Sequence, residues 1–379
     1  MTSAEDRPTT TIETGAGGLL LAADEALHID NLSMDFPVKR RHGLRSTTVY
    51  NHAVSDVNLT VRRGEVLGLV GESGCGKTTL GRCIVRDYRP SSGHIYYRDD
   101  SGTIHDLVNQ RPADLRVLQR QIRVIFQDPF SSLNPRMTIG QIVGDPLKAN
   151  GIARGSELED RVAEMLRRVG LLPSQMHRYP HAFSGGERQR VNIARALILE
   201  PRVVVADEAV SALDVSVRAQ ILNLLQDLRD ELDLTYIFIS HDLSVVESLC
   251  DRVAVMYLGK IVEVAETEAL YEAPRHPYTE ALISAVPRPD PRLRGTGRRV
   301  RLSDEFPDPT DPPTGCYFHT RCRYADDSTC REREPELVLV GDGHRSACHY
   351  SDSLRLEGAR VGVVDPPTEP SREAPGVEP

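Results

Sequence analysis

Residues 71–79 read GESGCGKTT, and this stretch decides the fold. It follows the apolar run EVLGLVG (65–71) and precedes LGRCIVRDY (80–88), which is compatible with a helix. A strand, a glycine loop and a helix in this order form a phosphate-binding loop, because backbone N–H groups make an anion nest and the helix N-terminus adds its positive end. We therefore expect a phosphate site made of Gly71, Glu72, Ser73, Gly74, Cys75, Gly76, Lys77, Thr78 and Thr79.

Two side chains of this loop have chemical roles in such a site. Lys77 would reach the β- and γ-phosphates of a nucleotide, and the Thr78 hydroxyl would bind Mg²⁺. Cys75 is interpreted as a small filler, since backbone amides do the binding. The alternative is coincidence, which ordinary residue frequencies put at roughly 1% for a chain of this length.

An acidic pair supplies the second half of a nucleotide site. The run RVVVAD (202–207) ends in Asp207, which is followed by Glu208. An aspartate at the end of a strand beside the phosphate loop can hold Mg²⁺, and Glu208 is placed to polarise an attacking water. The alternative is a capping acidic pair. His241 ends another apolar run (236–240), where it is either structural or a contact to the γ-phosphate and the lytic water.

Short apolar runs alternate with helical stretches along the chain. In residues 215–232, apolar side chains recur at helical spacing. Strands that alternate with helices predict an α/β fold, with a parallel sheet covered on both faces. The runs expected to be its strands are 65–71, 122–127, 202–207, 236–240 and 252–257.

A second helix start has the chemistry of a phosphate site. In FSGGERQRVNIARAL (183–197), Ser184, Gly185 and Gly186 open a predicted helix. Because the loop at 71–79 already cradles its own phosphates, a second helix N-terminus implies a second contact on a nucleotide.

With these motifs the chain resembles the ATP-binding subunits of ATP-binding cassette (ABC) transporters over residues 27–270. The resemblance implies a P-loop NTPase fold of the ABC type, with a RecA-like core, an antiparallel β subdomain and a helical signature subdomain. Its six motifs occur in the expected order: GESGCGKT (71–78), VIFQDP (124–129), FSGGE (183–187), VVVADE (203–208), SALD (211–214) and ISHD (239–242).

The resemblance also implies residue roles. Phe36 would stack on adenine, and Gln127 would contact Mg²⁺ and the lytic water. Ser184 and Gly186 would bind the γ-phosphate of the ATP held by the opposite subunit, while Asp214 would lie across the dimer seam. The implied Mg²⁺ ligands are Thr78, Gln127 and Asp207, and the implied catalytic residues are Glu208, His241, Lys77 and Gln127.

The chain departs from the family pattern at two positions. Glu187 replaces the commoner glutamine of the signature, and Ala209 stands where proline usually follows the Asp–Glu pair. Neither change removes a catalytic group.

Further stretches narrow the resemblance to the peptide-importer branch. These are QDPFSSLNPRMTIGQIV (127–143), VSALDVSV (210–217), HPYT (276–279) and PPTGCYFHTRC (312–322), which extend the match to about residues 27–350. The branch implies ATP hydrolysis with Mg²⁺ that drives uptake of di- or oligopeptides or a related small solute. The implied partners are a second, related ATPase subunit, two permease subunits and an external solute-binding protein. A homodimer of cassettes and a soluble, regulatory ABC-type ATPase are the alternatives.

Composition sets the expected compartment. The chain has 379 residues and a net charge of −9, which argues against a nucleic-acid partner. Its apolar stretches are shorter than the roughly 18 residues of a membrane span, and the polar, acidic residues 1–15 do not resemble a signal peptide. We expect the chain at the cytoplasmic face of the cell membrane, held there by permeases.

Composition also predicts how the chain is divided. Residues 1–26 are expected to be disordered, and so is the Pro- and Glu-rich tail at 358–379. A Pro-rich break then separates the cassette (27–287) from a small Cys-rich extension (288–357).

Four of the seven cysteines lie in that extension: Cys316, Cys322, Cys330 and Cys348. The cytosol disfavours a disulfide framework. The spacing lacks the C-x2-C pairs typical of structural zinc, and irregular spacing suits an iron–sulfur cluster. Some members of the resembled branch carry a [4Fe–4S] cluster on cysteines in this pattern, so we expect these four as its ligands. The alternatives are Zn²⁺, with His319 or His349 able to substitute, and four unconnected thiols.

Overall fold

The computed structural model describes residues 21–42, 45–128, 132–286, 300, 302 and 306–358. The predicted disordered ends fall mostly outside these ranges, at residues 1–20 and 359–379. Leu21 and Ala26, which precede the expected start of the cassette at residue 27, are buried, and the first strand begins at Glu25.

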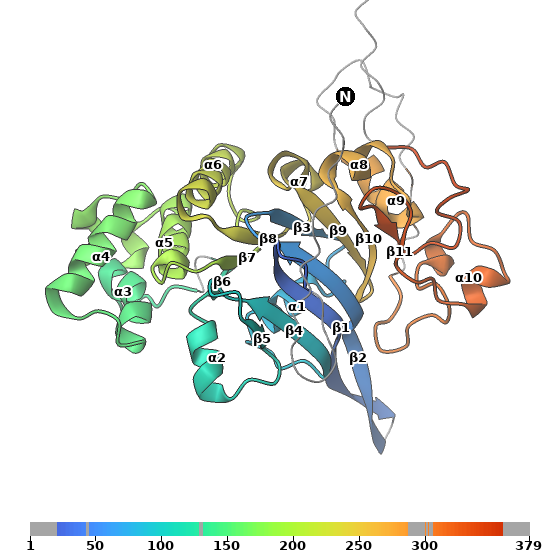
Figure 1. The fold of residues 1–379 in the computed structure, drawn as a ribbon, viewed down its shortest axis with the longest axis horizontal. Helices are drawn as coiled ribbons and strands as arrows, with labels where there is room; N and C mark the ends of the chain where they lie inside the picture. The colour runs from blue at the N-terminus through green and yellow to red at the C-terminus, as the bar shows by residue number, and fades with distance from the viewer. Residues whose placement is uncertain are drawn as a thin grey trace, which may run out of the picture.

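A sheet with the strand order β11-β12-β10-β9-β3-β8-β7-β6 crosses the centre of the molecule (Figure 1). Strands β9, β3, β8, β7 and β6 are parallel, which confirms the strands predicted from the apolar runs. The bounds are β3 Val66–Val70, β6 Ile122–Ile125, β7 Val203–Asp207, β8 Thr235–Ile239, β9 Arg252–Tyr257, β10 Lys260–Glu266, β11 Val338–Leu339 and β12 Arg345–Ser346.

Each parallel strand supplies two hydrophobic cores, because successive side chains of a strand point to opposite faces. In β3, Val66 and Val70 join the core on the side of the helical subdomain. Leu67 and Leu69 join the core on the other side. Strands β7, β8 and β9 alternate in the same way. Burial on both faces explains why these strands read as continuous apolar runs.

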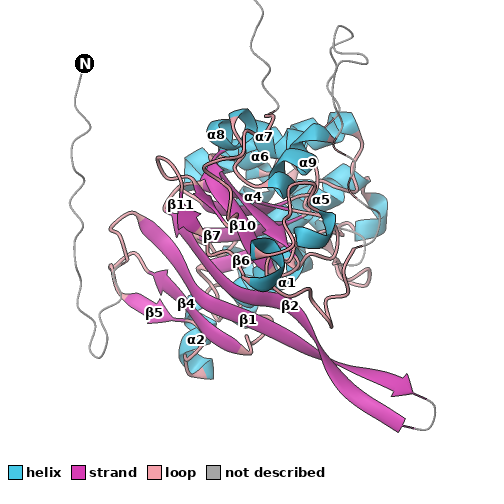
Figure 2. Cartoon of the chain, turned by 90° about the vertical axis from the view of Figure 1, so that its right-hand side faces the viewer, coloured by secondary structure: helices cyan, strands magenta, loops and turns pink. Residues whose placement is uncertain are grey.

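An antiparallel sheet in the order β2-β1-β4-β5 lies over the second core. It comprises β1 Glu25–His42, β2 Arg45–Arg62, β4 Ser92–Arg98 and β5 Ile104–Asp106. The hairpin of β1 and β2 extends well beyond the body of the molecule (Figure 2). Helix α1 (Lys77–Ile84) contacts β1 and β2 as well as β7 and β8, so it is enclosed between the two sheets.

A helical subdomain packs on the other side, at the left of Figure 1. It holds α3 (Ile139–Ala149), α4 (Gly155–Arg168) and α5 (Gly185–Leu197), with 3₁₀ turns at Pro173–His177 and Pro180–Ala182. The apolar face of α4 is buried at Val162, Met165 and Leu166. The remaining helices are α2 Pro112–Leu118, α6 Val215–Leu232, α7 Leu243–Leu249, α8 Thr267–Glu272 and α9 Pro277–Ser284.

The Cys-rich segment attaches to the central sheet rather than standing apart. Its strand β12 pairs with β10, and β11 pairs with β12. Its described residues include the short helical turns η4 (His319–Arg321) and α10 (Thr329–Glu332), and α10 is labelled at the right of Figure 1. No helix within the described ranges is both long and apolar enough to span a bilayer.

A buried carboxylate in β10 binds the Cys-rich segment to the edge of the sheet. Glu263 in β10 is 0% exposed, and its Oε1 lies 2.6 Å from Nε2 of His344. The same carboxylate accepts hydrogen bonds from the backbone N–H groups of Arg275 (2.6 Å) and His276 (3.0 Å). Glu263 therefore ties the Cys-rich segment and the start of α9 to the edge of the sheet.

Replacing Glu263 with alanine should loosen this edge. The change leaves His344 and two backbone N–H groups without their buried partner, so we expect local opening to become easier by about 3 kcal/mol. Native-state hydrogen exchange at Ala347, whose amide donates to the Val262 carbonyl, measures this opening.

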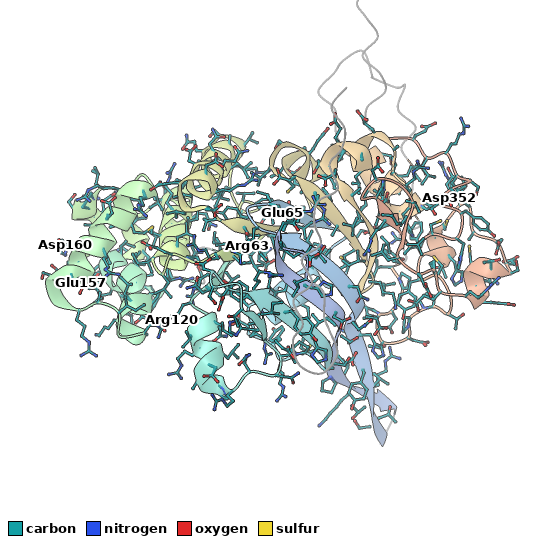
Figure 3. The ribbon with its side chains drawn as sticks, in the orientation of Figure 1. Arg63, Glu65, Arg120, Glu157, Asp160 and Asp352 are labelled. Atoms are coloured by element: carbon teal, nitrogen blue, oxygen red, sulfur yellow. The ribbon has the colours of Figure 1, made fainter. Side chains whose placement is uncertain are left out.

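The control is Glu157→Ala in α4, at the solvent edge of the helical subdomain (Figure 3). Its ion pair with Arg161 is exposed, and its loss should change stability by less than about 0.5 kcal/mol. An Ala347 exchange rate that is unchanged by Glu263→Ala would contradict the anchoring role.

Candidate functional site

The glycine loop begins directly after β3 and ends at the N-cap of α1. Gly71, Gly74 and Gly76 have positive φ angles of 152°, 84° and 108°. A Cβ on Gly71 would lie 2.2 Å from the Met256 carbonyl oxygen, and one on Gly76 would lie 2.1 Å from that of Ala53. Only glycine fits both the backbone angles and the space at these two positions.

The N-terminus of α1 faces this loop. Its N-cap is Gly76, and its first turn is Lys77, Thr78 and Thr79. No side chain in the described part of the protein caps this helix end through a hydrogen bond. The first N–H groups of α1 are thus available to an anion, in the arrangement that the sequence predicts.

Lys77 is 5% exposed, and its ammonium group is held by the loop itself. Nζ donates to the carbonyl oxygens of Gly71 and Glu72, both at 2.8 Å. Cys75 is buried beneath the loop, and burial raises the pKa of its thiol. This agrees with its interpretation as a filler rather than a reactive group.

The acidic pair lies against the loop. The Thr78 hydroxyl donates to Asp207 Oδ1 at 2.9 Å, which joins α1 to the end of β7. Burial raises the pKa of the Asp207 carboxyl, and the hydrogen bond from Thr78 opposes that rise. A hydroxyl and a carboxylate side by side are hard oxygen donors of the kind that Mg²⁺ prefers.

The Glu208 carboxylate contacts the side chains of Gln127 and His241. Gln127 Nε2 donates to its Oε2 at 2.8 Å, and His241 Nδ1 lies 3.2 Å from its Oε1. Glu208 has a positive φ of 45°, an unusual angle for a residue other than glycine. The Glu208 carboxylate is 17% exposed and His241 is 57% exposed, so this triad opens to solvent.

A cavity of about 300 Å³ lies beside Lys77, Thr78, Gln127 and Glu208. Asp207 and His241 do not line it, but they contact its lining residues Thr78 and Glu208. Nine predicted site residues line it: Phe36, Ser73, Gly74, Gly76, Lys77, Thr78, Thr79, Gln127 and Glu208. The sequence did not point to the other wall, made of Asn51, His52, Ala53, Leu258, Gly259 and Pro309. These residues come from β2, from the turn after β9 and from the C-terminal segment, and they match no local motif.

Ser184, Gly185, Gly186 and Asp214 lie elsewhere, at the N-termini of α5 and α6. Ser184 and Glu187 form a capping box, whose hydrogen bonds lower the pKa of the Glu187 carboxyl. The two helix starts adjoin, because a Cβ on Gly186 would lie 2.5 Å from a methyl carbon of Val217. The signature and the SALD loop therefore form one surface, separate from the cavity.

The four C-terminal cysteines line one small cavity of about 20 Å³, together with His276, His319 and His349. Burial raises the pKa of Cys316 to about 12 and that of Cys348 to about 11. Among the residues that the structure describes, no group of three or more His, Cys, Asp or Glu side chains is arranged to hold a metal ion. The segment thus gathers the predicted ligands around one cavity but not at ligand distances.

Two family profiles match the chain. One, described as "ABC transporter", matches residues 54–211, which hold the phosphate loop, Gln127, the signature and the acidic pair. The other, described as "Oligopeptide/dipeptide transporter, C-terminal region", matches residues 262–330.

Named relatives match over most of their length. The chain is 47% identical over 327 residues to the oligopeptide transport ATP-binding protein AppF of Bacillus subtilis, covering 85% of this chain and 96% of the relative. It is 46% identical over 326 residues to the dipeptide transport ATP-binding protein DppF of Haemophilus influenzae, covering 86% and 97%.

A solved structure of an ABC cassette has the same fold. The cassette MJ0796, in a dimeric post-hydrolysis state bound to ADP and Pi, superposes with a TM-score of 0.53 at 27% identity, covering 64% of this chain and 98% of that one. The chain therefore belongs to the ATP-binding subunits of the oligopeptide/dipeptide family of ABC transporters, and it is an ATPase.

Proposed function

We propose that the chain hydrolyses Mg·ATP to energise the uptake of di- or oligopeptides, or a related small solute, through partner permeases. The observation that carries the proposal is the single cavity in which Lys77, Thr78, Gln127 and Glu208 meet. The named relatives support the peptide class, since they are described as oligopeptide and dipeptide transport proteins. A soluble regulatory ATPase is less well supported, because it leaves the match to the transporter C-terminal region without a role.

The geometry suggests a division of labour. Glu208 would polarise the lytic water, oriented by the amide of Gln127 and by His241. Lys77 would exchange its two carbonyl partners for phosphate oxygens. Thr78, Asp207 and Gln127 would hold Mg²⁺, which when bound neutralises phosphate charge. Phe36, on the cavity wall, would stack on adenine; its ring lies edge-on to Tyr88 at 5.5 Å.

Ser184, Gly185, Gly186 and Asp214 would act on the nucleotide of another subunit. Their support is their position on α5 and α6, away from the cavity that Lys77 lines. Two cassettes would close head to tail over two ATP molecules, as the resemblance implies. We propose that the second cassette is a related but different polypeptide, and that two permeases and an external solute-binding protein complete the complex at the cytoplasmic face of the membrane.

The four C-terminal cysteines would hold a [4Fe–4S] cluster, with Zn²⁺ as the alternative. The support is that Cys316, Cys322, Cys330 and Cys348 line one cavity. Because this cavity measures only about 20 Å³, the four thiols would have to move apart to admit a cluster. A single Zn²⁺ ion would require a smaller movement. The metal would be structural or redox-sensing. It would sit in the extension (288–357) that we distinguish from the cassette ending near residue 287.

Glu208→Gln tests the catalytic assignment. The amide keeps the shape of the side chain but cannot take a proton, so kcat for ATP hydrolysis should fall at least about 100-fold while the Kd for Mg·ATP changes less than about threefold. The matched control is Glu247→Gln, an exposed glutamate on α7, which should leave both values unchanged. Full turnover in Glu208→Gln would remove this residue from the mechanism.

Co-purification from native membranes tests the subunit pairing. Tagging this chain should recover a second, different cassette polypeptide in equal amount, since the resemblance to the peptide-importer branch implies two related ATPase subunits. A complex that contains this chain as its sole cassette would refute the heterodimer and leave the ATPase assignment intact.

Metal content tests the cysteine cavity. Anaerobic purification of the full chain should give a brown protein with about four irons, since thiolates are the ligands of such clusters. Cys330→Ser should lose the colour, whereas Cys83→Ser, at a buried cysteine of α1, should keep it. A colourless preparation with one zinc would support the alternative, and a metal-free one would refute both.

A further inference from the structure

The carboxylate of Glu72, the second residue of the phosphate loop, forms an ion pair with an arginine of the Cys-rich segment. Arg321 Nη1 lies 2.6 Å from Glu72 Oε2, and Nη2 lies 2.9 Å from Oε1. This is a two-bond pair between residues that are far apart in the sequence. Bidentate pairs of this kind fix direction as well as distance. The Arg321 side chain is 5% exposed and that of Glu72 is 30% exposed, so the pair is only partly screened by water.

The backbone of Glu72 is held as well. Its N–H donates to the hydroxyl of Tyr278 at 2.8 Å, and Tyr278 is fully buried in α9. Its carbonyl oxygen accepts the bond from Lys77 Nζ. The side chain, the N–H and the carbonyl of one loop residue are therefore all engaged, and two of the three partners come from beyond residue 270.

Aromatic rings hold Arg321 in place. Its guanidinium carbon lies 5.8 Å from the centre of the Tyr257 ring and 5.7 Å from that of Phe306, within the range of cation–π attraction. Phe318, between two of the four cysteines, packs on Tyr257 at 5.2 Å and on Tyr278 at 5.4 Å. The cysteine cavity and the Glu72 contacts thus share one aromatic cluster.

The charge of Glu72 makes its ion pair with Arg321 relevant to nucleotide binding. A carboxylate in a loop that receives a polyanionic phosphate chain repels its ligand unless the charge is balanced. Arg321 supplies that balance through the side chain of Glu72, and the N-terminus of α1 keeps no side-chain cap in the described residues. Without it, Glu72 would repel the nucleotide and would be free to swing toward Lys77.

We propose that Arg321 is a positioning residue for ATP binding: the Cys-rich segment clamps and neutralises Glu72, and so sets the affinity of the phosphate loop. The inference rests on the proposed role of residues 71–79 as the ATP site. It gives the C-terminal extension a direct effect on the nucleotide, in addition to any metal that it holds.

The test measures binding of the magnesium complex of a non-hydrolysable ATP analogue, AMP-PNP, to the full chain by calorimetry. Arg321→Gln should weaken binding about tenfold, because it leaves a carboxylate unpaired beside the phosphates. The double variant Glu72→Gln with Arg321→Gln should recover to within about threefold of Glu72→Gln alone, since the repelling charge is gone. In the assembled transporter, Arg321→Gln should raise KM for ATP and change kcat little.

Arg323→Gln is the matched control. Arg323 pairs with the buried Glu280 at 3.0 and 3.1 Å in the same segment, and its partner is in α9 rather than in the loop. It should lower thermal stability but leave analogue binding within about twofold of the unaltered chain.

Two outcomes would overturn the inference. One is binding by Arg321→Gln within twofold of the unaltered chain. The other is a loss that the added Glu72→Gln change does not relieve, which would indicate a structural tether without an electrostatic role. If the unaltered chain binds no analogue, the proposed ATP site itself fails, so the two failures are distinguishable.

Discussion

The site depends on the close approach of two carbonyl groups to the glycine loop. The Met256 carbonyl leaves no room for a side chain at Gly71, and the Ala53 carbonyl leaves none at Gly76. One comes from β9 of the parallel sheet and the other from β2 of the antiparallel sheet. The loop is therefore seated between both layers, and this seating fixes the backbone of the loop next to the N-terminus of α1.

The same fold brings distant parts of the chain to the glycine loop and the acidic pair. Strand β7 delivers Asp207 to Thr78, and the segment after β6 delivers Gln127 to Glu208. The C-terminal segment delivers Arg321 to Glu72. In parallel sheets the carboxyl ends of neighbouring strands meet at one edge, which is where α/β folds gather polar side chains. The fold thus places the carboxyl ends of the strands side by side, and the short motifs that follow the strands provide the polar side chains of the site.

Much of this could be predicted from the sequence. The parallel strands are buried on both faces, so they read as apolar runs, and the motifs at their ends are local in the chain. His52 and Pro309 on the cavity wall could not be found in this way, because they reach it through the β1–β2 register and through a long-range contact. The bond between Arg321 and Glu72 was missed for the same reason. The burial of Leu21 could not be predicted either, because it depends on tertiary contacts rather than on local composition.

Residues 71–79 are proposed to receive the phosphates of Mg·ATP. The most direct test is a structure of the full chain with Mg²⁺ and a non-hydrolysable ATP analogue. In that structure Lys77 Nζ should leave the Gly71 and Glu72 carbonyls for phosphate oxygens, Mg²⁺ should lie beside Thr78 and Asp207, and Arg321 should keep its contact with Glu72. A nucleotide bound elsewhere, with Lys77 still on the two carbonyls, would contradict this proposal.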